Sequence, residues 1–329
     1  MDVRPRVSDP QDESLLKMAR LDCDWYGENA RVFDALRHPD LHFLPGMVFN
    51  VPHVVELLQR ARQKPPEEQW WLILMGHQPQ SLAGTWSKLG PMLQRFGIKL
   101  FYYAFDEASR FMPCFPELAP FIDVYVHDES PLHPPHAAKL PAACLRVHRS
   151  WVANFVPFAV PFNEDPASIL IFLGSKLGLT PHRQRQVEFL QRTFKDKFIA
   201  FHDHSVPVAE RAALNRYKIS VCPEGRKFAT AAMSATHTDR PFWSGCLGMV
   251  PVSENSAQGD RLESLHAAGL LLRYDHGDLS SLRQACERAL DLPLSERRRI
   301  YTHYNEEETV GTVIARLMAK VESGRIRGS

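Results

Sequence analysis

Short apolar runs alternate with longer amphipathic stretches along this chain. An apolar run that stops at glycine, proline or an acidic residue is typical of a buried strand in a parallel sheet. A stretch with apolar residues every three or four positions predicts a helix that packs on such a sheet. The regular alternation of the two patterns predicts an α/β fold, in which helices connect parallel strands through right-handed crossovers.

The first half of the chain contains four such apolar runs. We expect strands at residues 70–75, 98–105, 122–126 and 155–160, and helices at residues 51–63 and 81–96. A shorter helix is expected at residues 14–21, after a polar start. The first three strands are followed by Gly76-His77, Asp106-Glu107 and His127-Asp128, so these polar residues are expected at the carboxyl edge of a sheet.

A break in the apolar pattern at residues 161–167, with the sequence PFNEDPA, separates the two halves. Beyond it, strands are expected at residues 168–173, 197–201, 219–222, 249–252 and 270–274, and helices at residues 182–194, 208–216, 241–247, 279–290, 294–304 and 306–321. We therefore expect one α/β domain at residues 1–160, a second at residues 161–305, and a C-terminal helix within residues 306–329.

The composition fits this two-domain interpretation and excludes some partners. The chain has 329 residues, of which 44% are hydrophobic and 23% are charged, as in ordinary globular proteins. A formal net charge of +1 gives no strong field for nucleic acid or an anionic membrane. No apolar run approaches the ~20 residues of a membrane helix, and the polar N-terminus lacks a signal sequence, so a cytoplasmic protein is expected. The six cysteines have no metal-type spacing and are expected to be reduced core thiols.

The most informative stretch spans residues 218–256. An expected strand ends at Cys222-Pro223, a loop with several cationic and hydroxyl side chains follows, and Pro241 is well placed in the first turn of a short helix. Gly248 ends that helix, and the β-branched run after it predicts the next strand. The loop and the helix start are thus expected at the carboxyl edge of a sheet, where open α/β proteins bind ligands. Arg240 at this helix start suits a phosphate group.

This stretch resembles the donor-binding segment of GT-B glycosyltransferases, and most of all that of the exostosin-like and CgeB-type groups. Cys222-Pro223, Arg240, Gly248 and Pro251-Val252 carry the resemblance, which covers about the last half of the chain. It implies two Rossmann-like lobes with a cleft between them, and a C-terminal helix that crosses back to the first lobe. It also implies a nucleotide-diphosphate sugar as donor, with UDP or GDP as the nucleotide. One position departs from the pattern, because Trp243 replaces a residue that is usually acidic.

The resemblance implies a set of donor-binding residues. Arg240 is expected on the diphosphate because a guanidinium can bind two phosphate oxygens at once, although a surface salt bridge is the alternative. Thr238 can bind a phosphate or simply cap the helix. His202 and His204 form an HxH pair, for which we prefer a contact with the nucleotide base to metal binding because no third ligand is evident. The full set of donor-binding candidates is Arg240, Arg226, Lys227, Thr238, Gly174, Ser175, Lys176, Glu254 and His202, where Glu254 can contact a ribose hydroxyl or the acceptor.

The sequence also suggests how a transfer reaction would proceed. Retaining GT-B enzymes carry two glutamates at positions that are Ala235 and Trp243 here, so an inverting reaction is expected. No pair of acidic residues marks a metal site, and we expect arginine and a helix dipole to stabilise the leaving diphosphate without a metal. Candidates for the base that deprotonates the acceptor hydroxyl are Asp106, Glu107, His77 and Glu28. Each of these can instead be a helix cap or a salt-bridge partner.

Two other functions remain open at this stage. A nucleotide-sugar epimerase of the same fold needs several carboxylates near the anomeric centre, which this segment lacks. A catalytically inactive GT-B homologue that acts as a binding or scaffold partner is compatible with Trp243 in place of the acid. The acceptor itself, whether a glycan, a small molecule or a macromolecule, is not specified by the sequence, and the net charge gives no support to nucleic acid.

Overall fold

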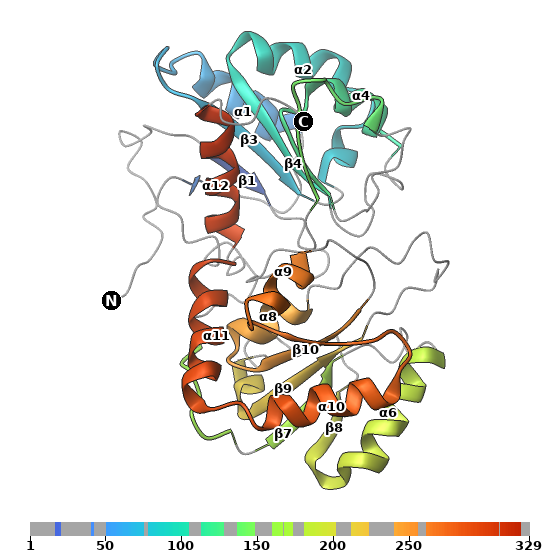
Figure 1. Cartoon of the computed structure of the whole chain (residues 1–329). Coiled ribbons are helices and arrows are strands. Elements are labelled where there is room, and N and C mark those ends of the chain that lie inside the picture. Colours follow the sequence, from blue (N-terminus) through green and yellow to red (C-terminus); the bar gives the residue numbers. More distant parts are fainter. Residues whose placement is uncertain are drawn as a thin grey trace. The chain divides into compact units, whose positions relative to one another are not determined.

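The computed structural model divides the chain into two compact units (Figure 1). Unit 1 comprises residues 1–149 and 311–329, and unit 2 comprises residues 150–310. The structure describes residues 17–20, 41–42, 51–75, 78–104, 113–127, 137–148, 160–166, 168–173, 181–201, 212–223, 240–255, 261–308 and 310–323. These units divide the chain at 149/150 and 310/311, compared with the domain boundaries of 160/161 and 305/306 expected from the sequence.

Unit 1 is built on a parallel sheet of six strands. Their spatial order is β2 (Leu41–His42), β1 (Lys17–Arg20), β3 (Trp70–Met75), β4 (Ile98–Tyr103), β5 (Val124–His127) and β6 (Leu145–His148). Every neighbouring pair of these strands is parallel. The α-helices of this unit are α1 (Val51–Ala61), α2 (Trp86–Arg95), α4 (Phe115–Leu118) and α12 (Val310–Glu322), and short 3-10 helices lie at Gln78–Leu82 and Ala119–Phe121.

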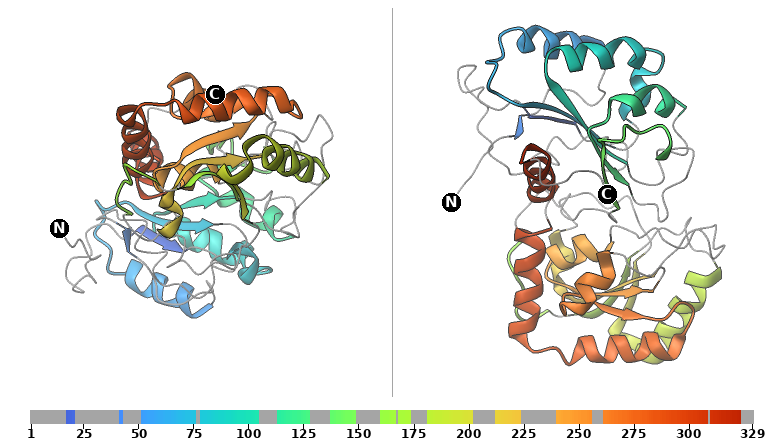
Figure 2. Two further views of the ribbon diagram at one scale, coloured as in Figure 1. Left: turned by 90° about the horizontal axis from the view of Figure 1, so that it is seen from below. Right: turned by 45° about the horizontal axis from the view of Figure 1, so that its top comes forward.

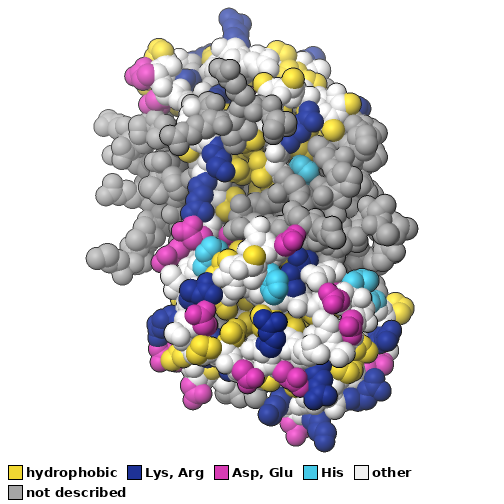
Figure 3. Space-filling view, in the orientation of Figure 1, with side chains coloured by type: hydrophobic (Ala, Val, Ile, Leu, Met, Phe, Trp, Pro, Cys, Tyr) yellow, Lys and Arg dark blue, Asp and Glu magenta, His cyan; other side chains and the backbone are white. Residues whose placement is uncertain are grey.

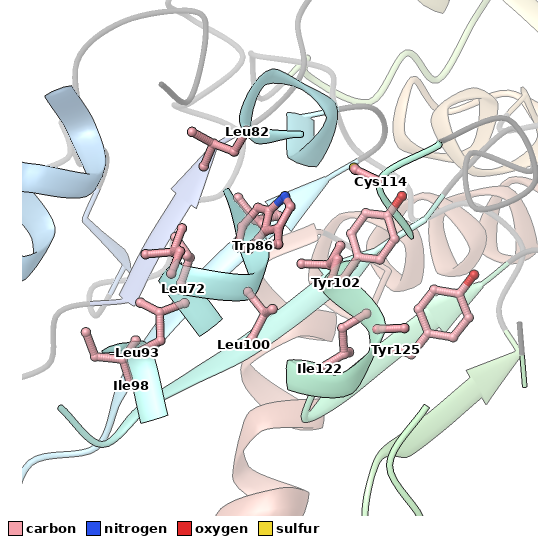
Figure 4. Packing of buried hydrophobic residues seen from close by; sticks show 14 of the residues in the cluster. Leu72, Leu82, Trp86, Leu93, Ile98, Leu100, Tyr102, Cys114, Ile122 and Tyr125 are labelled. Atoms are coloured by element: carbon pink, nitrogen blue, oxygen red, sulfur yellow. The ribbon is translucent and has the colours of Figure 1, made fainter. Parts of the chain in front are cut away.

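The core of unit 1 forms where helix α2 covers the sheet (Figure 4). Trp86, Leu89 and Leu93 lie on one side of α2, as the spacing of three and four positions predicts, and all three are buried. They belong to the same cluster as Leu100 and Tyr102 of β4. Burial of these large side chains is what holds the helix on the sheet, since apolar burial contributes about 25 cal/mol per Å².

Unit 2 contains a second, five-stranded parallel sheet (Figure 2). Its spatial order is β11 (Leu272–Tyr274), β10 (Val250–Glu254), β9 (Tyr217–Cys222), β7 (Ser168–Leu173) and β8 (Phe198–Phe201). All four neighbouring pairs are parallel. The helices of this unit are α6 (Pro181–Phe194), α8 (Arg240–Cys246), α9 (Arg261–Ala267), α10 (Leu279–Leu290) and α11 (Leu294–Glu306), with 3-10 helices at Lys195–Lys197 and Ala212–Arg216.

Helices cover both faces of the unit 2 sheet. Helix α8 packs on β9 and β10, and α10 packs on β9, β10 and β11. Ser220 of β9 accepts a hydrogen bond from Ser244 of α8 at 2.8 Å, so this side of β9 faces α8. Pro251 of β10 pairs with Ser220, and Ser253 pairs with Cys222, so these β10 side chains face α8 as well. Glu254 follows Ser253 and therefore points to the opposite face.

In unit 2 the direction in which successive strands are added to the sheet reverses between β7 and β9. From β7 the chain continues to β8 on one side, and it then returns to β9 on the other side of β7. Unit 1 has the same arrangement around β1, with β2 on one side and β3 on the other. Such a reversal is the topological switch point at whose carboxyl edge open α/β sheets bind ligands.

The parallel α/β architecture in two units agrees with the sequence-based prediction of the fold class. One element was predicted wrongly: residues 14–21 were expected as a helix, but Lys17–Arg20 form strand β1, paired with both β2 and β3. The pattern also missed strand β6 and helix α9. The strand expected at residues 155–160 falls almost wholly outside the described residues.

The described cysteines are packing residues. Cys114, Cys144, Cys222, Cys246 and Cys286 are buried thiols that form no disulfide, as the sequence predicted for reduced core thiols. Burial raises the pKa of the Cys114 and Cys144 thiols to about 12, so both are uncharged near neutral pH. Among the helices that the structure describes, none is both long and apolar enough to cross a membrane.

Helix α8 is held against α11 at a glycine. A Cβ atom added at Gly245 would lie 2.2 Å from the ring of Tyr304, which is fully buried on α11. The turn after α8 uses a second glycine, since Gly248 has a φ of 83° and its N–H donates to the carbonyl of Gly245 at 3.0 Å. Small residues at these two positions therefore set the close approach of α8 to its neighbour.

We predict that Gly245→Ala lowers the free energy of unfolding by about 1–3 kcal/mol, the usual cost of overpacking a filled core. Alanine would otherwise favour a helix by up to about 1 kcal/mol over glycine, so the sign of the change tests the contact with Tyr304. Urea unfolding of the full chain provides the measurement. In a Tyr304→Ala background, which removes the opposing ring, the same substitution should be neutral or stabilising; an equal loss in both backgrounds would show that the ring is not the cause.

Candidate functional site

The carboxyl edge of the unit 2 sheet contains two of the residues that the sequence singled out. Of the predicted site residues, the structure describes Arg240, at the start of α8, and Glu254, at the end of β10. The remaining predictions lie outside the described residues: the donor-binding candidates Arg226, Lys227, Thr238, Gly174, Ser175, Lys176 and His202, and the base candidates Asp106, Glu107, His77 and Glu28. The strands that precede several of them are described, since Gly174 comes directly after β7 and His77 comes shortly after β3.

Arg240 is a buried cation with few partners among the residues that the structure describes. It is 8% exposed, and within those residues its guanidinium donates one hydrogen bond, to the carbonyl oxygen of Pro223, over a long 3.4 Å. No carboxylate within the described ranges forms an ion pair with it. Because a guanidinium offers five N–H groups and a buried charge is costly without a partner, this arrangement favours the binding of an anion.

The position of Arg240 is fixed by the sheet beneath it. Pro223 directly follows β9, one of the two strands that flank the switch point. The rest of α8 is anchored by Ser244, whose hydroxyl donates to Ser220 at 2.8 Å and lies 3.9 Å from the sulfur of Cys222. Both partners belong to β9, so the strand and the helix hold the guanidinium at the carboxyl edge.

Glu254 lies at the same level of the sheet. Ser253 pairs with Cys222, so the next residue of β10, Glu254, is level with Pro223 on β9. Glu254 also pairs with Tyr274, the last residue of β11. The carboxylate and the guanidinium therefore share one edge of the sheet, although they start from opposite faces of it.

The carboxylate of Glu254 is fully buried and surrounded by nitrogen atoms. Its Oε1 atom lies 2.7 Å from Nε2 of His182 and 3.3 Å from Nδ1 of His276. The same atom accepts hydrogen bonds from the amide of Gln186 and from the backbone N–H of Gly277, both at 3.0 Å. These partners come from the start of α6 and from the turn between β11 and α10, so one carboxylate connects three elements.

A second layer of contacts holds these partners in place. The hydroxyl of Tyr274 donates to Oε1 of Gln186 at 2.9 Å, which directs the amide nitrogen of Gln186 toward Glu254. The imidazole rings of His182 and His276 stack at a centroid distance of 4.6 Å and an interplanar angle of 19°. The His182 side chain is 30% exposed and that of His276 is 54% exposed, whereas Glu254 is 0% exposed. A ligand therefore meets the imidazoles first and the carboxylate behind them.

The sequence did not identify His182, Gln186, Tyr274 or His276 as site residues. His182 was interpreted only as the first residue of a helix and Tyr274 only as the last residue of a strand, and His276 was given no role. The available signal was positional: both histidines stand where a strand or its following loop gives way to a helix. That they approach the same carboxylate depends on the strand order, which the sequence pattern does not reveal.

The surface of unit 2 carries charges of both signs. On the face drawn in Figure 3, Lys and Arg side chains are interspersed with Asp and Glu side chains over this unit. Exposed ion pairs of this unit include Arg283 with Glu287 at 2.7 Å and Arg299 with Glu296 at 2.8 Å. Exposed pairs of this kind contribute little to stability, and the mixture on this face agrees with the net charge of +1.

Comparisons with known proteins give weak similarities only. No protein-family model matches the chain, and the search of curated proteins found no match. Among solved structures, the lipopolysaccharide outer core galactosyltransferase WaaB has a TM-score of 0.44 at 10% identity, with 95% of this chain and 99% of that chain covered. A UDP-N-acetylglucosamine 2-epimerase has a TM-score of 0.43 at 10% identity, with 96% and 98% covered. The spinosyn rhamnosyltransferase SpnG has a TM-score of 0.43 at 12% identity, with 93% and 99% covered. At such scores these matches carry no weight for function, which has to be inferred from the residues of this chain.

The contacts of Glu254 lead to a prediction about stability. Glu254→Leu leaves the buried amide of Gln186 and the N–H of Gly277 without their acceptor, and each unsatisfied donor costs about 1–3 kcal/mol. We expect the free energy of unfolding, measured in urea, to fall by about 2–5 kcal/mol.

The control is Glu287→Leu, which removes a 45% exposed glutamate from α10 and should change stability by less than about 0.5 kcal/mol. Similar losses for the two variants would contradict a structural role for the buried carboxylate.

Proposed function

We propose that this chain is a glycosyltransferase that moves a sugar from a nucleotide-diphosphate sugar to an acceptor hydroxyl, with unit 2 as the donor-binding lobe of a GT-B arrangement. The observation that carries the proposal is Arg240, a buried guanidinium located beside the switch point of a parallel sheet, with one long hydrogen bond to the part of the chain that the structure describes. Ligands of open α/β sheets bind at this place, and a diphosphate supplies the negative charge that such a guanidinium lacks.

The rest of the donor would extend along the same edge. The imidazoles of His182 and His276 are the exposed groups beside Glu254, and they offer a stacking surface and ring nitrogens to the base or the ribose. In this proposal Glu254 acts through the imidazoles, because its carboxylate is enclosed behind them. Gly174, Ser175 and Lys176, which follow β7, and Arg226, Lys227, Thr238 and His202 are proposed to complete the donor site.

The proposed reaction is an inverting displacement. The acceptor oxygen attacks the anomeric carbon, the bond from that carbon to the diphosphate oxygen breaks, and a base takes the proton of the acceptor hydroxyl. Asp106, Glu107, His77 and Glu28 are the proposed sources of the base. Arg240 stabilises the negative charge that develops on the leaving diphosphate, which is the role that a metal ion plays in other transferases.

A non-catalytic donor-binding protein is the second candidate, favoured by Trp243 at the position where related sequences carry an acid. The two candidates differ in turnover. A transferase hydrolyses its donor slowly when no acceptor is present, whereas an inactive homologue binds the donor and leaves it intact.

The first prediction concerns donor affinity. Arg240→Ala removes a charge-assisted contact worth roughly 1.5–3 kcal/mol, so binding of UDP or GDP, measured by calorimetry, should weaken about ten- to a hundredfold. Arg240→Lys should restore only part of the affinity because an ammonium group cannot bind two oxygens in a fork.

Arg283→Ala is the matched control, since this arginine is 57% exposed on α10 and pairs with Glu287. It should leave nucleotide affinity unchanged. A folded Arg240→Ala protein that binds both nucleotides as tightly as the unchanged chain would remove Arg240 from the donor site and, with it, the main support for the proposal.

The second prediction concerns metal ions of the kind that bind phosphates. If Arg240 neutralises the charge of the diphosphate, then addition of Mg²⁺ or Mn²⁺ to metal-free protein should change the rate of donor turnover by less than about twofold. A rate that depends on either ion would show that a metal, and not Arg240, carries the charge of the leaving group.

A further inference from the structure

The side chains around Glu254 have the composition of a metal site. His182, Glu254 and His276 each direct one ligand atom into the same space, and these three atoms lie within 4.8 Å of one another. We propose that they bind a divalent transition-metal ion, with Zn²⁺ as the best-suited ion. The site would use Nε2 of His182, Nδ1 of His276 and the carboxylate of Glu254, which come from α6, the turn after β11 and the end of β10.

One of the distances between the ligand atoms already matches that in a zinc site, and a second needs a small shift. Zinc bonds of about 2.0–2.2 Å in tetrahedral geometry place two ligand atoms about 3.3–3.5 Å apart. Nδ1 of His276 and Oε1 of Glu254 are already 3.3 Å apart. Nε2 of His182 lies 2.7 Å from the same oxygen, so this ring would withdraw by less than about 1 Å to admit the ion. The His182 side chain is 30% exposed and lies at the start of a helix, which leaves it room for this shift.

The groups behind the ligands match the outer shell of a metal site. The carboxylate of Glu254 accepts hydrogen bonds from the Gln186 amide and the Gly277 N–H, and Tyr274 in turn holds Gln186. Such contacts fix the direction of a ligand before the ion arrives, and their loss commonly costs ten- to a hundredfold in metal affinity. The two imidazoles reach solvent, so a fourth position remains open for water or another ligand.

The ligand set also selects the class of ion. Two imidazole nitrogens and one carboxylate oxygen suit zinc and its neighbours in the transition series, whereas Mg²⁺ and Ca²⁺ prefer oxygen ligands. The proposed site therefore differs in kind from a phosphate-bridging magnesium site. The sequence gave no reason to expect it, because the three ligands are far apart in the chain and only His202 and His204 had a metal-type spacing. The proposal does not depend on glycosyl transfer, since its readout is the binding of the ion.

The test uses the full chain, freed of metal by a chelator and titrated with Zn²⁺ in a calorimeter. One equivalent of Zn²⁺ should bind, and the same site should give Co²⁺ a tetrahedral visible absorption spectrum. His276→Ala removes one ligand from an exposed position and should weaken the binding of Zn²⁺ at least about tenfold without loss of folding. Gln186→Leu keeps all three ligands but removes the amide that orients Glu254, and it should weaken binding by about ten- to a hundredfold.

The matched control is the double variant His202→Ala/His204→Ala, which removes the HxH pair. It should still bind one equivalent of Zn²⁺ with unchanged affinity. Two results would overturn the proposal. One is a full chain that binds Zn²⁺ no more tightly than the double variant His182→Ala/His276→Ala. The other is a loss of the bound equivalent in the HxH control with retention in His276→Ala, which would place the ion at residues 202–204.

Discussion

A carboxylate that is removed from water must be hydrogen-bonded, and in unit 2 this requirement ties three elements together at one edge of the sheet. Glu254 is 0% exposed at the end of β10. Its partners are His182 and Gln186 of α6 and Gly277 in the turn before α10. An unpaired carboxylate at this depth would cost several kcal/mol. Moving the helix start, the strand end or the turn away from the other two would therefore lower the stability of the unit. This constraint fixes the part of the edge that is formed by the end of β10, the start of α6 and the turn before α10.

Arg240 presents the opposite situation at the same edge. Its charge is almost as well buried as that of Glu254, yet among the described residues it has one long hydrogen bond, to a backbone carbonyl. A fully satisfied polar group stabilises a fold, and a poorly satisfied one costs stability that a ligand can restore. At this edge, the polar group on one face of the sheet is hydrogen-bonded on all sides, whereas the guanidinium on the other face can still bind an anion. This contrast is the physical basis for placing a nucleotide diphosphate beside Arg240.

The sequence predicted the fold better than the site, for physical reasons. Strands β3 and β7 are mostly apolar runs followed by glycine, and β9 ends in an apolar stretch followed by proline, so their presence and their carboxyl ends could be predicted from the pattern. Strand β1 could not, because the segment KMAR is short and half charged, and only its pairing with β2 and β3 makes it a strand. The place of Arg240 in the fold could be predicted, because the sequence pattern marks both the strand β9 before it and the helix α8 that begins at it. The contacts of Glu254 with His182 and His276 could not, because they depend on the strand order β11-β10-β9-β7-β8.

Hydrogen–deuterium exchange with and without UDP or GDP tests the central claim most directly, since it reports which backbone amides a bound nucleotide protects. If the nucleotide binds at this edge, exchange should slow at the carboxyl ends of β9 and β10 and at the start of α8, within residues 218–223 and 240–255, with no comparable change in the strands of unit 1. Protection of unit 1 strands alone would place the nucleotide in the other unit, and unchanged exchange throughout the chain at saturating nucleotide would contradict a donor site at this edge.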